Sequence, residues 1–269
     1  MKKILLIGCG HMGSALLSSW AGTNKYLITV VDPLKKDILT KKYKNKKIKI
    51  FKSILSTDKS IKYDFILFAT KPIQLKDAIV DLKKIRIDNT ISIISIIAGK
   101  KINIFQKNFK NAKNIFRVMP NIPALIGQSM NCVVSNKDAS KIKKKEVLKL
   151  FSLSGKTIFL DNENQIDMTT AISGSGPGFI FNLIDATEKA AIKLGFKKET
   201  AKILVAQTFK GSINLYLENK LSAKDLVNTV ATKGGTTEAG LKVMNKNKIH
   251  KVFVDVANAS YKKSKQQGK

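Results

Sequence analysis

The sequence is poor in the residues that cross-link proteins or bind zinc. Its 269 residues include two cysteines, Cys9 and Cys132, and two histidines, His11 and His250. Two cysteines are too few for a disulfide framework, which indicates a protein of a reducing compartment. A zinc site of cysteine and histidine ligands would require all four residues to converge. We therefore expect neither a disulfide framework nor a metal site.

Long apolar runs are also missing. The longest, residues 91–99, contains serines and ends at a glycine, whereas a membrane-spanning helix needs roughly 18 apolar residues. The N-terminus has two lysines before the apolar residues 4–7, as an exported protein does, but Gly8 ends that run. A signal peptide needs an apolar stretch of roughly 7–15 residues before its cleavage site. The sequence thus favours a cytoplasmic protein.

Acidic residues and arginine are scarce, whereas lysine is abundant. The 49 basic residues outnumber 19 acidic ones, for a formal net charge of +30, and only Arg86 and Arg117 are arginines. A basic chain suits nucleic acid or anionic membranes, but recognition of bases and phosphates favours arginine. We interpret most lysines, including the run within residues 41–49, as solvated surface. The alternative, a basic nucleic-acid-binding protein, predicts affinity that falls steeply with salt and no binding of NADH.

The opening segment has the pattern of a strand, a glycine turn and a helix. Residues 3–7 are a short apolar run, typical of a strand buried on both faces of a parallel sheet. Gly8, Gly10 and Gly13 follow with the spacing G-x-G-x-x-G, and residues 14–21 have helical periodicity. In this motif the first glycine permits a tight turn, the second lets the backbone approach a pyrophosphate, and the third lets the helix pack on the strand. The segment predicts a dinucleotide-binding turn.

An acidic residue ends the next predicted strand, residues 26–31. Asp32 lies 19 residues beyond Gly13, near the position from which a carboxylate holds a ribose 2′-hydroxyl. The alternative is that Asp32 only caps the turn into Pro33. Lys35 and Lys36 could compensate the charge of a 2′-phosphate. The sequence therefore predicts NADPH or NADH as the coenzyme, with Asp32 modestly favouring NADH.

The strand pattern continues through the first part of the chain and then stops. Further strands are predicted at residues 64–69, 90–98, 114–119, 131–135 and 156–160, with lysine-rich helices such as 141–152 between them. From about residue 161 only helical periodicity remains. We predict an α/β fold in which a Rossmann-type, doubly wound sheet (residues 1–160) precedes an all-α substrate-binding and dimerisation domain (residues 161–269). Ligands of such sheets bind at the carboxyl ends of the strands, where Thr70, Lys71, Pro72 and Gly99 are expected.

Two glycine-rich segments of the second half invite catalytic interpretations. Residues 172–178 do not form a nucleophile elbow, because Ser173 stands where G-x-S-x-G needs a glycine; Ser173 or Ser175 instead suits a helix cap or a polar ligand contact. Residues 232–240 are not a phosphate-binding loop of the Walker type. Their two glycines before a helix could expose N–H groups to a small carboxylate, beside the hydroxyls of Thr236 and Thr237. The alternative is an ordinary helix start capped by threonine.

Together these segments resemble the pyrroline-5-carboxylate reductase family over nearly the whole chain. The matching segments are IGCGHMGSAL, FATKPIQL, ISIIAGKKI, IFRVMPNIPALIG, TAISGSGPGFIF and VATKGGTTEAGL, of which the last is the most specific. Gly178 and Phe179 stand where the family usually has Ala-Tyr. Thr232 and Lys233 stand where it usually has Ser-Pro, a difference that can alter the stiffness of the loop.

The resemblance implies an NAD(P)H-dependent oxidoreductase of the last step of proline biosynthesis. The nicotinamide would deliver a hydride to the imine carbon, and the carboxylate of pyrroline-5-carboxylate would meet N–H groups of Gly235 and Thr236. Thr237, as the catalytic residue, would hydrogen-bond the ring nitrogen and assist its protonation. The implied substrate contacts are Ser175, Val230, Gly234, Gly235, Thr236 and Thr237. The implied coenzyme contacts are Gly8, Cys9, Gly10, His11, Met12, Gly13, Asp32, Ala69, Thr70, Lys71, Pro72, Ala98 and Gly99.

The resemblance also implies self-association. The family forms dimers through intertwined helical domains, and these dimers often assemble into larger rings such as decamers. A rival enzyme class, the β-hydroxyacid dehydrogenases and ketol-acid-type reductases, uses a catalytic lysine or clustered carboxylates for Mg²⁺. Lys189 and Lys193 are available for that role, but Asp185 and Glu188 lack an obvious second acidic partner.

Overall fold

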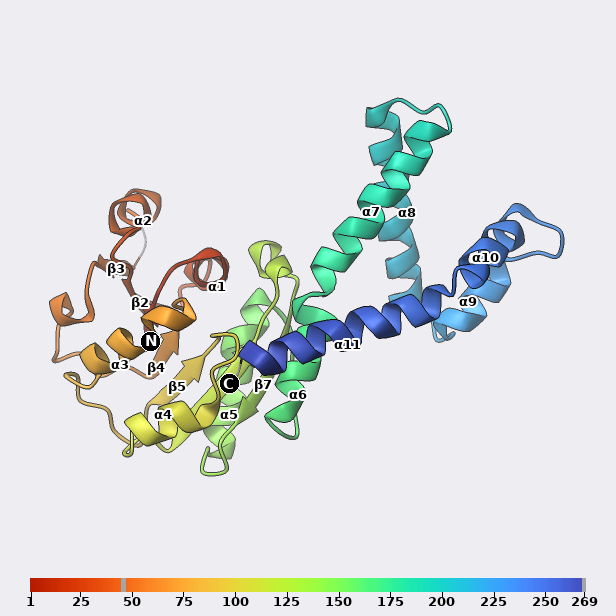
Figure 1. Cartoon of the computed structure of the whole chain (residues 1–269). Helices are drawn as coiled ribbons and strands as arrows, with labels where there is room; N and C mark the ends of the chain where they lie inside the picture. The colour runs from red at the N-terminus through yellow and green to blue at the C-terminus, as the bar shows by residue number, and fades with distance from the viewer. Residues whose placement is uncertain (45–46, 268–269) are drawn as a thin grey trace. The chain divides into compact units, whose positions relative to one another are not determined.

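A parallel sheet organises the first part of the chain. The computed structural model describes residues 1–44 and 47–267 (Figure 1). In this described part, eight strands form one sheet in the order β3-β2-β1-β4-β5-β6-β7-β8. The strands are β1 (Lys2–Ile7), β2 (Tyr26–Val31), β3 (Ile48–Phe51), β4 (Phe65–Phe68), β5 (Ser92–Ser95), β6 (Asn114–Met119), β7 (Ser129–Ser135) and β8 (Gly155–Phe159). The predicted Rossmann-type sheet is confirmed, and its order reverses between β1 and β4, the switch point where ligands of such sheets bind.

Helices cover both faces of this sheet, as the side chains of β1 require. Leu5 and Ile7 belong to one buried cluster, whereas Ile4 and Leu6 belong to the other, because successive side chains of a strand point to opposite faces. The helices are α1 (His11–Ala21), α2 (Lys36–Lys42), α3 (Leu75–Leu82), α4 (Ile102–Asn108) and α5 (Lys141–Phe151). The short helices η1 (Ile54–Ser56), η2 (Pro72–Gln74), η3 (Ile122–Ile126) and η4 (Ser152–Ser154) fill the connections. The first cluster packs under α3 and α4, and the second under α1 and α5.

Two features of the sheet differ from the pattern expected of the sequence. β7 is antiparallel to β6, because the connection through η3 is too short for the crossover that a parallel pair needs. β3, within and after the lysine run interpreted as solvated surface, pairs with β2 at the edge of the sheet. There Lys49 is exposed, while Ile48 and Ile50 pack against the buried cluster under α1. A short edge strand whose three apolar residues stand among lysines is a weak sequence signal.

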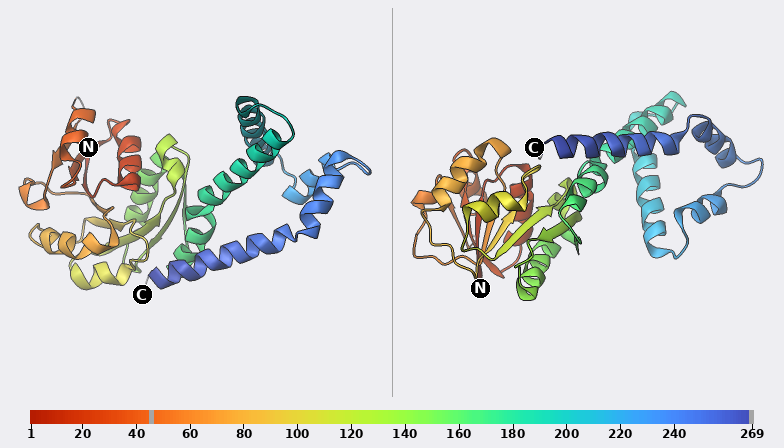
Figure 2. Two further views of the ribbon diagram at one scale, coloured as in Figure 1. Left: turned by 45° about the horizontal axis from the view of Figure 1, so that its top comes forward. Right: turned by 60° about the horizontal axis from the view of Figure 1, so that its bottom comes forward.

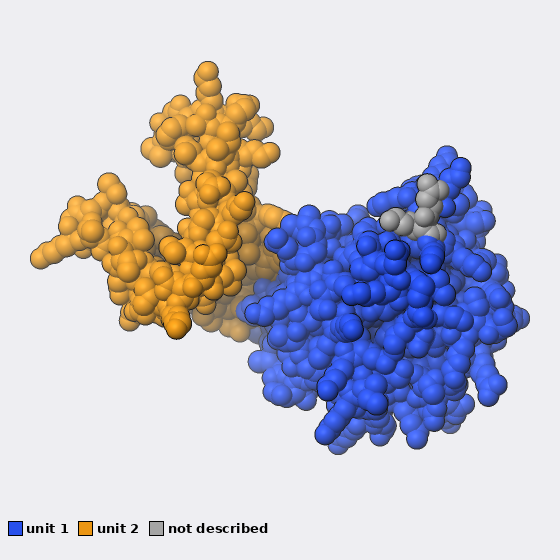
Figure 3. All heavy atoms as spheres, turned by 180° about the vertical axis from the view of Figure 1, so that it is seen from behind, with its two compact units in different colours: residues 1–175, 260–269 blue, residues 176–259 orange. Residues whose placement is uncertain are grey.

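The remainder of the chain is helical, as predicted. Its elements are α6 (Asn164–Thr169), a π-helical turn η5 (Thr170–Gly174), α7 (Gly176–Lys193), α8 (Lys198–Glu218), α9 (Ala223–Val230), α10 (Thr236–Lys246) and α11 (Ile249–Gln267). By their contacts the residues divide into unit 1 (1–175 and 260–269) and unit 2 (176–259) (Figure 3). Within unit 2, α7 and α8 pack against each other (Figure 2). No helix of the described residues is long and apolar enough to span a bilayer.

A buried ionic cluster connects α6 and the end of α11 to the sheet within unit 1. Arg117 on β6 is 2% exposed, and its Nη1 and Nη2 lie 3.4 Å from Glu163 Oε1 and Asp167 Oδ1, respectively. Glu163 also accepts a hydrogen bond from the N–H of Ile102 (2.8 Å), and Asp167 accepts one from Ser264 Oγ (3.0 Å). The cluster therefore joins α6 and the end of α11 to β6 and α4. A buried arginine with two carboxylate partners avoids the cost of an unpaired charge.

We expect Trp20 to be a principal stabilising contact of α1. Its indole Nε1 donates to the carbonyl of Leu150 (3.1 Å), and its ring meets that of Phe151 edge to face with centroids 6.1 Å apart. Trp20→Phe leaves a buried acceptor unpaired and should lower the free energy of unfolding by about 1–3 kcal/mol. Urea denaturation followed by far-ultraviolet circular dichroism measures this loss. Ile38→Ala, at a side chain 67% exposed, is the control; equal midpoints for both variants would contradict the assignment.

Candidate functional site

The glycine turn after β1 is held by close backbone approaches. Gly8 has a φ of +88°, and a Cβ there would lie 2.8 Å from the carbonyl carbon and oxygen of Ala69. A Cβ on Gly13 would lie 2.6 Å from the carbonyl oxygen of Gly8. These two positions admit only glycine without a backbone shift, since contacts under about 3.0 Å exceed what packing tolerates. They set α1 directly against the end of β1.

Gly10 has a different role from the other two glycines. It is the N-cap of α1, and nothing lies within 4 Å of the place where its Cβ would stand. The first N–H groups of a helix have no intrahelical acceptors and carry a partial positive charge. Open space at a helix start without a side-chain cap is the cradle that a pyrophosphate needs. The residues therefore fit the phosphates of a dinucleotide.

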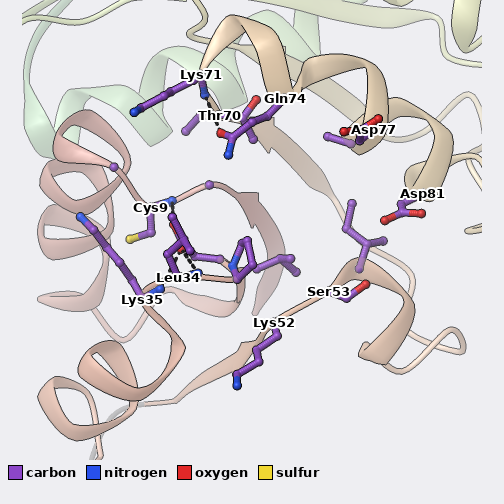
Figure 4. Close-up of a pocket in the computed structure, with 18 of the residues that line it drawn as sticks. Cys9, Leu34, Lys35, Lys52, Ser53, Thr70, Lys71, Gln74, Asp77 and Asp81 are labelled. Atoms are coloured by element: carbon purple, nitrogen blue, oxygen red, sulfur yellow. Dashed lines mark hydrogen bonds between the residues drawn. The ribbon is translucent and has the colours of Figure 1, made fainter.

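A cavity of about 590 Å³ opens at this turn in unit 1 (Figure 4). It lies among the carboxyl ends of β1, β2, β3 and β4 and one side of α3. The predicted coenzyme contacts that line it are Gly8, Cys9, Gly10, His11, Asp32, Ala69, Thr70 and Lys71. Met12, Gly13, Pro72, Ala98 and Gly99 are not among its lining residues, although they follow β1, β4 and β5 at the same edge of the sheet.

Sequence reasoning missed part of the cavity wall. Lys52 and Ser53 follow β3, a strand that we did not predict because its sequence is rich in lysine. Gln74, Asp77 and Asp81 come from η2 and α3, and the two aspartates lie one helical turn apart on the same face. The spacing of Asp77 and Asp81, which places both carboxylates on one face of a helix, is the one feature of the sequence that could have indicated this part of the cavity wall.

Asp32 makes the turn-capping contacts that the sequence left as an alternative. Its Oδ1 accepts hydrogen bonds from the N–H groups of Leu34 and Lys35, both at 2.9 Å. Its Oδ2 accepts one from the N–H of Cys9 at 2.8 Å. The carboxylate is thus bound to the glycine turn and to the loop after β2.

Cys9 is a packing residue at the cavity. Burial raises the pKa of its thiol; a hydrogen bond with Ser14 lowers that pKa, and the charge of Asp32 raises it. The Sγ lies 3.4 Å from Ser14 Oγ, whose hydroxyl donates to the carbonyl of Cys9 at 2.8 Å. A buried thiol with a raised pKa is a poor nucleophile at neutral pH.

The predicted substrate residues occur in both units. Ser175 belongs to unit 1, where its Oγ lies 3.0 Å from Ser260 Oγ. The other substrate residues belong to unit 2: Val230, Gly234, Gly235, Thr236 and Thr237. Val230 is the last residue of α9 and is exposed, and the glycines form the turn that precedes α10.

The hydrogen bonds of this second glycine turn define which N–H groups are open. Gly234, with a φ of +77°, donates its N–H to Glu238 Oε2 (2.9 Å), and Gly235 donates to the carbonyl of Thr232 (3.0 Å). The N–H groups of both glycines are therefore already used. Those of Thr236 and Thr237 belong to the first turn of α10 and have no intrahelical acceptors. A carboxylate at this turn would meet the two threonines, with Glu238 holding the loop.

Two of the residues considered for the rival enzyme class, Lys189 and Asp185, form an ion pair with each other. Lys189 Nζ lies 2.6 Å from Asp185 Oδ2, one turn earlier on α7, and both side chains are exposed. This is an ordinary surface ion pair of a helix.

We expect Gly13→Ala and Gly10→Ala to separate folding from coenzyme binding. Gly13→Ala forces α1 away from Gly8 and should cost about 1–3 kcal/mol of stability as well as dinucleotide binding. Gly10→Ala places a methyl group in open space, so it should leave the melting temperature nearly unchanged and weaken only binding. Thermal melts and calorimetric titration with NADH measure the two effects. Unaltered dinucleotide binding by Gly10→Ala would contradict the assigned phosphate cradle.

Two family patterns match this chain. Residues 163–267 match the pattern described as pyrroline-5-carboxylate reductase dimerisation, and residues 3–99 match that described as NADP oxidoreductase, coenzyme F420-dependent. The second match covers the glycine turn and all of the residues that line the cavity. The first covers all of unit 2 and the turn that contains Thr236 and Thr237.

Relatives that match this chain from end to end are pyrroline-5-carboxylate reductases. The chain is 30% identical to the pyrroline-5-carboxylate reductase of Methanosarcina acetivorans, over 100% of this chain and 98% of that protein. It is 31% identical to pyrroline-5-carboxylate reductase 2 of Bacillus subtilis, over 98% and 94% of the two chains. The pyrroline carboxylate reductase structure of Plasmodium falciparum, solved with NADP bound, is 29% identical, with a TM-score of 0.86 over 100% of this chain and 98% of that one. The Coxiella burnetii enzyme gives a TM-score of 0.87 at 29% identity, over 99% and 98%. With its glycine turn, its cavity and this similarity from end to end, the chain belongs to the pyrroline-5-carboxylate reductase family.

Proposed function

We propose that the protein reduces 1-pyrroline-5-carboxylate to L-proline with NADPH or NADH, the last step of proline biosynthesis. The observation that carries this proposal is the end-to-end similarity to pyrroline-5-carboxylate reductases, which includes both the glycine turn and the turn before α10. The reaction converts the C=N bond of the ring to C–N. A hydride adds to the imine carbon, and a proton adds to the ring nitrogen.

The coenzyme would be held by the edge of the sheet in unit 1. The reduced nicotinamide, when bound, supplies the hydride. N–H groups at the start of α1 would hold the pyrophosphate, beside Gly10 and His11. The remaining proposed contacts are Gly8, Cys9, Met12, Gly13, Ala69, Thr70, Lys71, Pro72, Ala98 and Gly99. The family relative solved with NADP supports coenzyme binding by this fold.

The substrate would be held by the turn before α10. The free N–H groups of Thr236 and Thr237, at the positive end of this helix, suit the carboxylate of the ring. Thr237 would place its hydroxyl on the ring nitrogen and assist its protonation, with Ser175 and Val230 as further proposed contacts. Positioning of the two reactants and a fixed field of N–H dipoles would supply most of the catalysis.

Self-association follows from the apolar surface of unit 2. Apolar side chains on α7, α8, α10 and α11 are exposed in the single chain, and they include Ile180, Phe181, Ile203, Leu204, Ile213, Leu217, Val243 and Phe253. A large exposed apolar surface indicates an interface. We propose that residues 161–269 form a dimerisation domain and that dimers assemble further into a decamer. We also propose that the enzyme is cytoplasmic, in keeping with its two buried free cysteines.

The activity should appear as oxidation of NADH or NADPH that depends on the imine. The assay follows the nicotinamide absorbance with and without pyrroline-5-carboxylate. Binding of both coenzymes without their consumption would preserve the assignment of the coenzyme site and refute the substrate. No binding of either coenzyme, together with salt-sensitive binding of nucleic acid, would favour the basic nucleic-acid-binding alternative.

We expect Thr237→Ala to lower kcat by about 100-fold or more, because a proton-transfer contact to the ring nitrogen is lost. The dissociation constant for NADH should change by less than about twofold, since the substitution leaves the coenzyme cavity intact. Steady-state kinetics and coenzyme titration separate these effects. Thr187→Ala, at an exposed threonine whose hydroxyl donates to Leu183 within α7, is the matched control. Equal losses of turnover and NADH affinity would contradict this role of Thr237.

The association state can be tested by light scattering on the eluted protein. We expect a mass of at least twice the 29.7 kDa of one chain, because burial of the apolar faces of unit 2 favours association. Phe181→Glu, at a side chain 60% exposed on α7, should shift the population toward the monomer. A wild-type protein that elutes as a monomer would refute the dimer.

A further inference from the structure

The carboxylate of Asp32 has little capacity left for a coenzyme. A carboxylate has about four acceptor positions, and hydrogen bonds from Cys9, Leu34 and Lys35 occupy three of them. The residue is 8% exposed, although it borders the cavity. The general rule that an acid after the second strand excludes a 2′-phosphate presumes a carboxylate free to face the ribose.

These three bonds connect two walls of the cavity. Cys9 belongs to the glycine turn after β1, whereas Leu34 and Lys35 belong to the loop between β2 and α2. The N–H of Gly8 donates to the carbonyl of Val31 at 2.8 Å, which continues the pairing of the two strands up to Asp32. Loss of the carboxylate would leave N–H donors without acceptors on both walls, so its contacts determine the shape of the cavity.

Two lysines of the cavity wall follow β2 and β3, the paired strands beside which Asp32 lies. Lys35 and Lys52 follow β2 and β3, and Ser53 lies next to Lys52, whereas Asp77 and Asp81 lie across the opening on α3 (Figure 4). Among the described residues, neither lysine has an ion-pair partner. Two lysines without ion-pair partners on the cavity wall, together with a carboxylate already bound by three N–H donors, favour an added phosphate over a bare hydroxyl.

We propose that Asp32 is a positioning residue that shapes the coenzyme cavity, and that Lys35 and Lys52 select a coenzyme with a 2′-phosphate. The inference rests on the proposed function only in taking this cavity as the adenosine side of the coenzyme site. It reverses the preference for NADH that the position of Asp32 in the sequence suggests. Asp32 acts through the backbone of Cys9, Leu34 and Lys35 and touches no reacting atom.

Two nucleotide fragments test the inference without any imine substrate. Calorimetric titration of the full-length protein compares adenosine 5′-monophosphate with adenosine 2′,5′-bisphosphate, which differ only in the 2′-phosphate. We expect the wild-type protein to bind the bisphosphate about tenfold more tightly, the effect of one charge-assisted contact. Tighter binding of the monophosphate would overturn the proposal.

Variants of Asp32 and of the two lysines separate the positioning role from the selection of the 2′-phosphate. Asp32→Asn should weaken both fragments by a similar factor and lower the melting temperature, which leaves the ratio of their affinities within about twofold of the wild-type value. A carboxylate that faces the ribose would instead produce a rise of about tenfold or more in the relative affinity for the bisphosphate, and that result would overturn the positioning role.

The lysine variants keep the test decisive if Asp32→Asn folds poorly. Lys52→Ala and Lys35→Ala should each weaken the bisphosphate by about three- to tenfold and the monophosphate by less than about twofold. Lys107→Ala, which removes an exposed lysine of α4 outside the cavity wall, should change neither. Equal affinities of the lysine variants and the control for the bisphosphate would refute the selection by lysine.

Failure of this inference and failure of the proposed function give different results. A protein that reduces pyrroline-5-carboxylate with NADH yet rejects the bisphosphate would retain the function and lose the inference. A protein that binds the bisphosphate as expected but reduces no imine would retain the inference and lose the substrate assignment.

Discussion

The close approach of the start of α1 to the end of β1 is the constraint on which the coenzyme site depends. With no Cβ at Gly13, the first turn of the helix lies against the carbonyl of Gly8, and with none at Gly8 the turn lies against Ala69 after β4. These contacts bring three chain segments to one edge of the sheet and leave the space at Gly10 open. Packing at van der Waals limits thereby supports a cavity at the start of a helix, where backbone N–H groups lack intrahelical acceptors.

The lysines of this protein and its Arg117 lie at different depths below the surface. Nearly all of its lysines are at the surface, whereas Arg117, one of only two arginines, is buried and paired with two carboxylates that come from the helical half of the sequence. The planar guanidinium can serve both carboxylates at once, which the point charge of a lysine does less well. A high net charge is thus compatible with a specific buried ionic cluster.

Much of the fold could be predicted from the sequence because its signals are local. The apolar run of β1, the glycine spacing and the helical periodicity after residue 161 each occupy a short window, and the structure has the corresponding strand, turn and helices. The reversal of β7 and the edge strand β3 are less visible in the sequence, since the first depends on the length of a connection and the second is a four-residue strand among lysines. Consequently Lys52 and Ser53, which follow β3, were absent from the predicted site.

The sequence by itself determined the family, the two kinds of architecture and the position of the glycine turn, because residue type and spacing specify backbone conformation over a few residues. Only the tertiary structure decided how the polar groups are used. It binds the carboxylate of Asp32 to three N–H groups from two loops, and it uses the N–H groups of Gly234 and Gly235 within their own turn. A hydrogen bond depends on distance and direction between atoms that lie far apart in sequence, and spacing along the chain does not contain that information.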